Sequence, residues 1–318
     1  MLRIGKLKES VYQRSVEKQF HNEKSFQPLR MHTITVDGWT LAAERLVYNM
    51  VNCFAAESAL VTQMTVSVHM PRGSEEAELR KFTARLGVLC KEFAIWVSMG
   101  EVRVIEGCKR PLCMAVGVSD PKAASMRLPK GEKSLPGLDR QSIKADMDVI
   151  VAGSIACEGA AILAIEHESE LKERFAAFYV QTAKELYDAA AMPAVQEILL
   201  KEKAFGTAVL EGGIFAGLWN MAAAGKVGLD IDLSAIPIKQ HTVEVCEFFD
   251  LNPYMLLSGG CLLIVASHGA SLLSALQRAG IAATIIGRTT STNDRIIHYD
   301  DEIRYLEPPK TDEIYKVS

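Results

Sequence analysis

The chain has 318 residues, of which 49% are hydrophobic and 23% are charged, with seven cysteines and a formal net charge of −4. This length predicts about two domains and a core large enough to fold without disulfide or metal staples. The composition excludes collagen-like and low-complexity disordered architectures. Lys and Arg total only 35 and form no basic stripe, so the sequence also argues against nucleic acid as a partner.

No segment has the character of a targeting signal or a membrane span. Charged residues follow the start MLRIGKLKES at once, so the apolar stretch of a signal peptide is missing. The longest aliphatic run covers about six residues, from Cys261 to Ala266, whereas roughly 20 are needed to cross a bilayer. The cysteines form no C-x-x-C pair, which favours reduced, packed thiols over a metal site. We therefore expect a cytoplasmic protein with no membrane partner.

Hydrophobic spacing predicts an α/β (α+β) fold. In the first half, apolar residues that recur at steps of three and four indicate helices, and alternating apolar residues indicate half-buried strands. In chain order, the elements predicted there are a helix over 44–58, a strand over 64–70, a helix over 75–91 and strands over 94–105 and 112–118. The first 35 residues carry no pattern that we can interpret.

A change of composition over 119–146 predicts a linker, because prolines and glycines stand there among charged residues. We therefore divide the chain into an N-terminal domain, 1–145, and a C-terminal domain, 146–318. The elements predicted in the second domain are a strand over 149–151, a helical region over 159–200 with a break near 192–193, a helix over 214–224, a strand over 227–233, a helix over 240–249, a strand over 261–266, a helix over 270–279 and a strand over 281–286.

Three stretches of the second half resemble a known family. They read EGGIFAGLWNMA from Glu211, VGLDIDLSAIPI from Val227 and TVEVCEFFDLNPY from Thr242. They look like the C-terminal domain of the aminoimidazole ribonucleotide (AIR) synthase superfamily, which includes the hydrogenase-maturation dehydratase, selenophosphate synthetase and thiamine-monophosphate kinase. The resemblance is to the AIR synthase-related or hydrogenase maturation factor members. It is strong from Asp146 onward and weak before it.

The resemblance implies a two-domain AIR synthase-like fold, with an N-terminal mixed sheet, helices and a C-terminal α/β domain. It implies a homodimer that forms through the N-terminal sheets, with ATP and Mg²⁺ bound near the junction of domains and subunits. Phosphoryl chemistry of this kind needs carboxylates that hold metal ions and amides or cations that face the phosphates.

Several polar positions of the family pattern carry other residues in this chain. The segment 19–31 lacks the glycines and aspartates of the family's acidic, glycine-rich stretch. Asn52 is followed by Cys53 where an Asn-Asp pair is usual, and a thiol is a poor ligand for Mg²⁺. The motif GGHTE keeps only Glu101, and the motif DVTxGG keeps only Gly212 and Gly213.

The residues that survive define the candidate site. By the resemblance, Asp37, Thr40, Glu101, Gly212 and Gly213 would bind the cofactor, and Asp37 and Glu101 would hold a metal ion; no catalytic residue can be named. The plainer interpretation makes the two carboxylates exposed or capping groups at strand ends and the glycine pair a tight turn. Two carboxylates with waters suffice for a weak Mg²⁺ site, and a helix N-terminus offers amides to an anion.

Our first hypothesis is a pseudoenzyme without a cofactor, a homodimer that binds a small ligand or a protein partner. The first alternative is an ATP-dependent dehydratase, ligase or phosphotransferase whose rebuilt site takes ATP and Mg²⁺. The second is a scaffold subunit of an active paralogue. An open polar cleft between the halves would favour activity, whereas a cleft filled by Trp39, Met99 and Leu210 would favour the pseudoenzyme.

Overall fold

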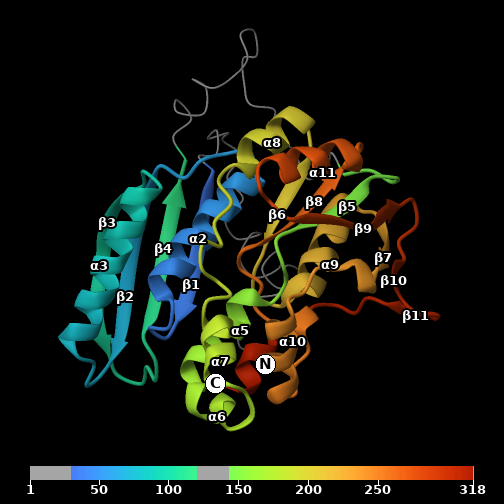
Figure 1. Ribbon diagram of the computed structural model, residues 1–318. Helices are drawn as coiled ribbons and strands as arrows, with labels where there is room; N and C mark the ends of the chain where they lie inside the picture. The colour runs from blue at the N-terminus through green and yellow to red at the C-terminus, as the bar shows by residue number, and fades with distance from the viewer. Residues whose placement is uncertain (1–29, 120–142, 318) are drawn as a thin grey trace.

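Two mixed β-sheets organise the chain, and a helix lies between them (Figure 1). The computed structural model describes residues 30–119 and 143–317. The predicted segment 19–31 and the linker 119–146 therefore lie largely outside the described residues, and the division at 145/146 stays a prediction. Within the described parts, no helix is both long and apolar enough to span a bilayer.

The first half forms a four-stranded sheet in the order β1-β4-β2-β3. Only the β2–β3 pair is parallel. Its elements are β1 (Met31–Asp37), α2 (Ala42–Ala56), β2 (Gln63–Pro71), α3 (Glu76–Glu92), β3 (Trp96–Ile105) and β4 (Leu112–Val118). Both predicted helices and all three predicted strands are confirmed. The edge strand β1 was not predicted, although Ile34 and Val36 alternate there with outward threonines.

The second half forms a seven-stranded sheet in the order β11-β10-β7-β9-β5-β8-β6. Its strands are β5 (Asp148–Ala152), β6 (Phe205–Val209), β7 (Gly228–Asp232), β8 (Cys261–Ala266), β9 (Ala283–Thr290), β10 (Arg295–Tyr299) and β11 (Glu302–Tyr305). Its helices are α5 (Cys157–Glu166), α6 (Glu168–Arg174), α7 (Ala177–Lys184), α8 (Val195–Glu202), α9 (Gly213–Gly225), α10 (Gln240–Phe248) and α11 (Gly269–Arg278), with the 3-10 turns η3 (Leu233–Ala235), η4 (Pro253–Met255) and η5 (Glu313–Lys316). The predicted elements are confirmed, whereas β6, β10 and β11 were not predicted; β11 is exposed along its whole length and shows no apolar face.

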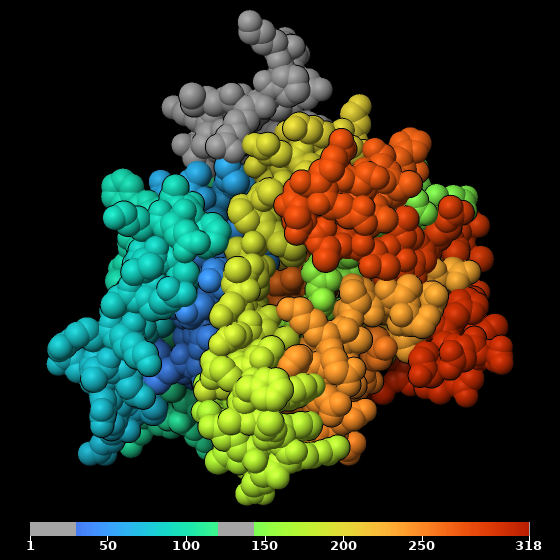
Figure 2. Space-filling model, viewed as in Figure 1, coloured from blue at the N-terminus to red at the C-terminus, as the bar shows by residue number. Residues whose placement is uncertain are grey.

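Helix α2 belongs to both halves. It packs on β1 and β4 on one side and on β6, β8 and α8 on the other. Nearly all of its residues are buried, so it is hydrophobic or internally paired all round rather than amphipathic. One continuous apolar cluster extends from the first sheet through α2 into the second sheet. In Figure 2 the yellow-green to yellow segment that contains α6, α7 and α8 runs along the junction of the two halves.

Alanine substitutions at two helical glycines would show how closely the helices pack. A Cβ on Gly159, in α5, would lie 2.4 Å from Leu256 Cγ, whereas a Cβ on Gly87, in α3, would have nothing within 4 Å. We expect Gly159→Ala to lower the free energy of unfolding by about 1–3 kcal/mol through overpacking. Gly87→Ala is the matched control and should raise it by roughly 0.5–1 kcal/mol, because alanine favours an exposed helix. Urea denaturation of both variants measures the difference, and equal changes would contradict the packing of α5 on Leu256.

Candidate functional site

A small polar cleft lies where the two halves meet. Its walls come from the end of β1, helix α2, the loop before β4, helix α5 and the C-terminal segment. The lining residues are Asp37, Arg45, Arg110, Ile162, Leu163, Glu166, His167, Leu257 and Ile314. The free volume is about 20 Å³, which is room for about one water molecule. Side chains therefore close the cleft.

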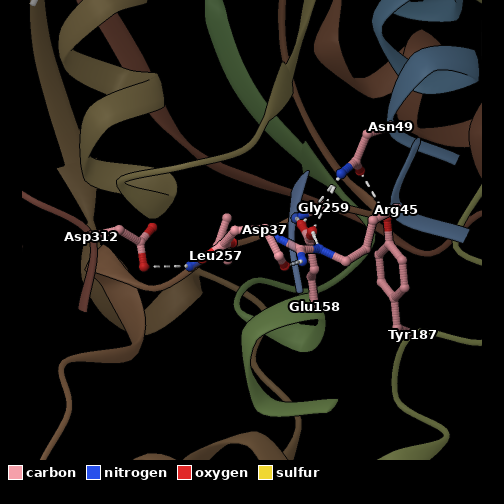
Figure 3. Close-up of polar contacts among 8 residues, drawn as sticks. All are labelled: Asp37, Arg45, Asn49, Glu158, Tyr187, Leu257, Gly259 and Asp312. Carbon is pink, nitrogen blue, oxygen red and sulfur yellow. Dashed lines mark hydrogen bonds and ion pairs between the residues drawn. The ribbon is translucent and has the colours of Figure 1, made fainter. Parts of the chain in front are cut away.

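A buried ion pair forms the floor of the cleft (Figure 3). Arg45 Nε of α2 donates to Glu158 Oε1 of α5 at 2.7 Å, and Arg45 Nη1 donates to the main-chain oxygen of Asp37 at 3.2 Å. Arg45 is 5% exposed and Glu158 only 1%. Burial by itself would lower the pKa of Arg45, but the Glu158 carboxylate raises it above its ordinary value. The Arg45 guanidinium therefore stays protonated, and its bond to Glu158 ties the first half of the chain to the second.

The Glu158 carboxylate also accepts hydrogen bonds from groups other than Arg45. The Gly259 N–H donates to Oε2 at 2.9 Å, and the Asn49 amide lies 3.4 and 3.5 Å from the two carboxylate oxygens. Tyr187 in turn donates its hydroxyl to Asn49 Oδ1 at 2.8 Å (Figure 3). Burial raises the pKa of Tyr187 well above its ordinary value, so this hydroxyl stays protonated. A buried ion pair is tolerated when such additional hydrogen bonds satisfy both ions.

A second, more exposed ion pair spans the cleft. Arg110 Nη2, from the loop before β4, donates to Glu166 Oε2 at 2.7 Å, and Thr40 Oγ1 donates to Glu166 Oε1 at 2.7 Å. Burial by itself would raise the pKa of Glu166, but the hydrogen bonds from Thr40 and Arg110 lower it below its ordinary value. We call Thr40, Arg110 and Glu166 the clasp.

Asp312 makes a third set of polar contacts that closes the cleft, after the Arg45–Glu158 pair and the clasp. The residue is 2% exposed. Its Oδ2 accepts from the Gly212 N–H at 2.6 Å, and its Oδ1 accepts from the N–H groups of Leu257 at 3.2 Å and Ile314 at 2.9 Å. Burial raises the pKa of Asp312 to about 7, although these N–H groups lower it. The amide of Gly212, at the start of α9, therefore faces a carboxylate of the chain itself.

The structure brings only part of the predicted site together. Asp37 lines the cleft and Thr40 belongs to the clasp. Gly212 and Gly213 have φ of +83° and +64°, a left-handed backbone that favours glycine, and they begin α9. They form the tight turn of the plainer interpretation, and whether that turn also binds an anion stays a prediction.

Glu101 lies elsewhere. It stands on β3, within 3.5 Å of His69 and 2.8 Å of Arg103. Strands β1 and β3 are the opposite edges of the four-stranded sheet, so Asp37 and Glu101 are separated by three strand spacings, about 14 Å. One ion with ligand distances of roughly 2–2.6 Å cannot bind both carboxylates within this chain. Their assignment as a metal pair stays a prediction that this placement does not support.

Two carboxylates at the cleft already have arginine partners. Glu158 is paired with Arg45, and Glu166 is paired with Arg110. Across the described residues, no three His, Cys, Asp or Glu side chains come together as a possible metal site.

Sequence reasoning missed most of the residues that close the cleft: Arg45, Asn49, Arg110, Glu158, Glu166, Tyr187 and Asp312. One signal was available, because Arg45 and Asn49 stand four residues apart in a helix that is otherwise apolar on several faces. A second was Glu158 within an apolar run, since an unpaired carboxylate is almost never fully buried. Neither signal names the partner, which lies more than 100 positions away.

Comparisons with known proteins match this fold. Residues 144–300 match the family model described as AIR synthase related protein, C-terminal domain. The second half of the chain thus carries a domain that matches the C-terminal domain of AIR synthase related proteins. The family and the α/β fold predicted from the sequence are thereby confirmed.

Relatives and solved structures agree with the family. The carbamoyl dehydratase HypE of Rhizobium leguminosarum bv. viciae is 24% identical, over 92% of this chain and 85% of its own. A crystal structure of a HypE–HypF complex matches with a TM-score of 0.73 and 16% identity, covering 94% of this chain and 100% of that chain. A HypE structure in complex with ATP matches with a TM-score of 0.70 and 16% identity, covering 98% of both chains. At this identity the solved structures show a shared fold.

The buried pair of this AIR synthase related chain can be tested by a double-mutant cycle. We expect Arg45→Met and Glu158→Gln each to lower the free energy of unfolding by about 3–5 kcal/mol, because each leaves a buried partner unpaired. Arg45→Met combined with Glu158→Gln should cost clearly less than the sum of the two single changes. The same changes in the exposed clasp, Arg110→Met and Glu166→Gln, serve as the control and should cost less than about 1 kcal/mol each. Additive effects at Arg45 and Glu158 in urea denaturation would contradict the coupling.

Proposed function

We propose that this chain is a HypE-like member of its family that has lost metal-dependent ATP chemistry and acts by binding. The buried Arg45–Glu158 pair carries this proposal, because a carboxylate at the cleft is already engaged by a guanidinium of the protein itself. A magnesium ion would have to compete with a guanidinium that is already paired and desolvated. Removing that guanidinium would leave a carboxylate buried without a counter-charge, which is costly.

The Asn-Cys pair on α2 supports the same proposal. Asn52 donates through Nδ2 to the Ala190 carbonyl at 2.9 Å and accepts at Oδ1 from the Met192 N–H at 2.7 Å. It therefore fastens the segment between α7 and α8 to α2. Cys53 is buried in the same helix. Residues at a position where the family resemblance implies a metal ligand thus contribute to packing and chain fastening.

The competing proposal is an ATP-dependent enzyme with a rebuilt site. It is favoured by one observation, the close fold match to the HypE structure in complex with ATP. The two proposals differ in what they require of the cleft. An enzyme needs the clasp, the C-terminal segment and Arg45 to move far enough to admit a nucleotide.

ATP binding separates these proposals. We expect calorimetric titration with ATP and Mg²⁺ to show no saturable binding tighter than about 1 mM, and a phosphate-release assay to show no turnover above the blank. The HypE protein that has been solved with ATP is the positive control under the same conditions. Saturable micromolar binding coupled to phosphate release would refute the loss of activity.

The first sheet supports the proposed homodimer, and with it a role in binding proteins. Among the described strands β3 is an edge of its sheet, it is exposed along almost its whole length, and Trp96 at its start is 76% exposed. Unpaired edges and exposed apolar groups are features that proteins normally cover. A HypE protein also forms a complex with HypF, which makes a protein partner part of the proposal. Cytoplasmic localisation belongs to the proposal as well.

The oligomeric state tests the homodimer. We expect sedimentation equilibrium to show a dimer, and Trp96→Glu to raise its dissociation constant at least about tenfold, because a charge would enter the desolvated sheet interface. Val88→Glu is the matched control, since Val88 is 57% exposed on α3, and it should leave the dimer intact. A monomer, or equal effects of both changes, would contradict the sheet interface. A stable self-dimer would also argue against an obligatory heteromer with a paralogue.

A further inference from the structure

The C-terminal segment Asp312–Lys316 packs into the junction of the two halves although it lies at the end of an exposed connection. Residues 307, 308 and 310 are exposed, whereas Asp312, Glu313 and Ile314 are 2%, 5% and 7% exposed. Two adjacent carboxylates with so little exposure are uncommon, because carboxylates are almost never fully buried unless they are paired. The segment is therefore anchored by specific contacts.

Polar contacts made by neighbouring carboxylates anchor the segment. Asp312 accepts from the N–H groups of Gly212 and Leu257, which belong to two different parts of the second half. Glu313 accepts from the Asn252 N–H at 3.0 Å and from Lys316 Nζ at 2.6 Å. Releasing the segment would break both sets of contacts and would leave the sheet hydrogen bonds intact.

The anchored segment forms part of the cleft wall. Ile314 lines the cleft together with Asp37 and Arg45. Burial raises the pKa of the Tyr315 hydroxyl, the charges of Glu211, Asp37 and Asp312 raise it further, and Arg45 lowers it. The segment thus shares the cleft wall with Asp37 and Arg45, and its Tyr315 interacts electrostatically with both.

We propose that Asp312–Lys316 is a latch, and that its release opens the cleft while the two halves stay joined by Arg45 and Glu158. The halves share one apolar core and a buried ion pair, so separating them would cost much free energy. The latch follows an exposed connection and is held by hydrogen bonds from a few main-chain N–H groups. It can therefore detach locally while the rest of the fold stays intact. This inference goes beyond the proposed function and does not depend on it.

The Asp312 carboxyl makes the latch sensitive to pH. Its pKa is about 7 when docked and has the ordinary value of 3.8 when free, so docking takes up a proton between these values. Docking is therefore strongest at low pH and weakens as the pH rises through about 7. The charged or titratable groups that face this site are Glu211 at the start of α9, Glu313, Tyr315 and Lys316 on η5, and Asp37 and Arg45 at the cleft.

Hydrogen exchange of the full chain, followed by mass spectrometry, tests the latch. In Asp312→Ala we expect the protection factors of Gly212, Leu257 and residues 313–316 to fall at least about tenfold, with β5 and β8 unchanged. Asp301→Ala removes the same charge from an exposed turn and should change none of them. Unchanged protection in Asp312→Ala would overturn the proposal, and so would loss of protection throughout β5 and β8, because the segment would then be part of the global fold.

Two milder variants keep the test independent of overall folding. Lys316→Ala changes an exposed side chain and should lower protection at Asn252 and residues 313–316 by a few-fold. Between pH 6 and pH 8 the wild-type protection factors of the segment should fall, and Asp312→Asn, which cannot titrate, should lose this dependence. The same pH dependence in Asp312→Asn would contradict the assignment to Asp312. ATP binding bears only on the proposed function, so the two proposals can fail separately.

Discussion

A guanidinium–carboxylate pair shielded from water joins the two halves of this protein. Moving each ion out of water costs several kcal/mol, and the attraction between Arg45 and Glu158 offsets that cost only when the other donors and acceptors are satisfied. Asn49, Tyr187 and the Gly259 amide provide those contacts. Each comes from a different part of the chain, so the pair positions α2, α5, the segment after α7 and the turn before β8 relative to one another.

The same pair engages one of the carboxylates at the cleft, because Arg45 donates to Glu158. The clasp repeats this arrangement nearer the surface, with Arg110 and Glu166. The fold of the family is nevertheless retained, since it is carried by apolar residues and glycines that do not take part in metal binding.

Helix α2 shows how a fold and a site can change independently. Its apolar residues pack on both sheets and join them in one core. Its polar residues have specific internal partners: Arg45 and Asn49 bind Glu158, and Asn52 holds the chain before α8. A helix buried all round tolerates polar side chains only with such partners. The polar residues of this helix are therefore held by partners elsewhere in the chain, as the bonds of Asn52 to Ala190 and Met192 illustrate.

Local pattern in the sequence determined most of the secondary structure, because periods of two and of three to four residues reflect which side of an element is buried. It also determined the family, through glycine and apolar positions of the second half. It failed at β1, β6, β10 and β11, which are short or lie at sheet edges. Only the tertiary structure decided the cleft, because Arg45 and Glu158 are 113 positions apart, and Asp312 and Gly212 are 100 apart. Whether a charged side chain is exposed, paired or closes a cleft depends on partners that chain topology brings together, and no local period encodes them.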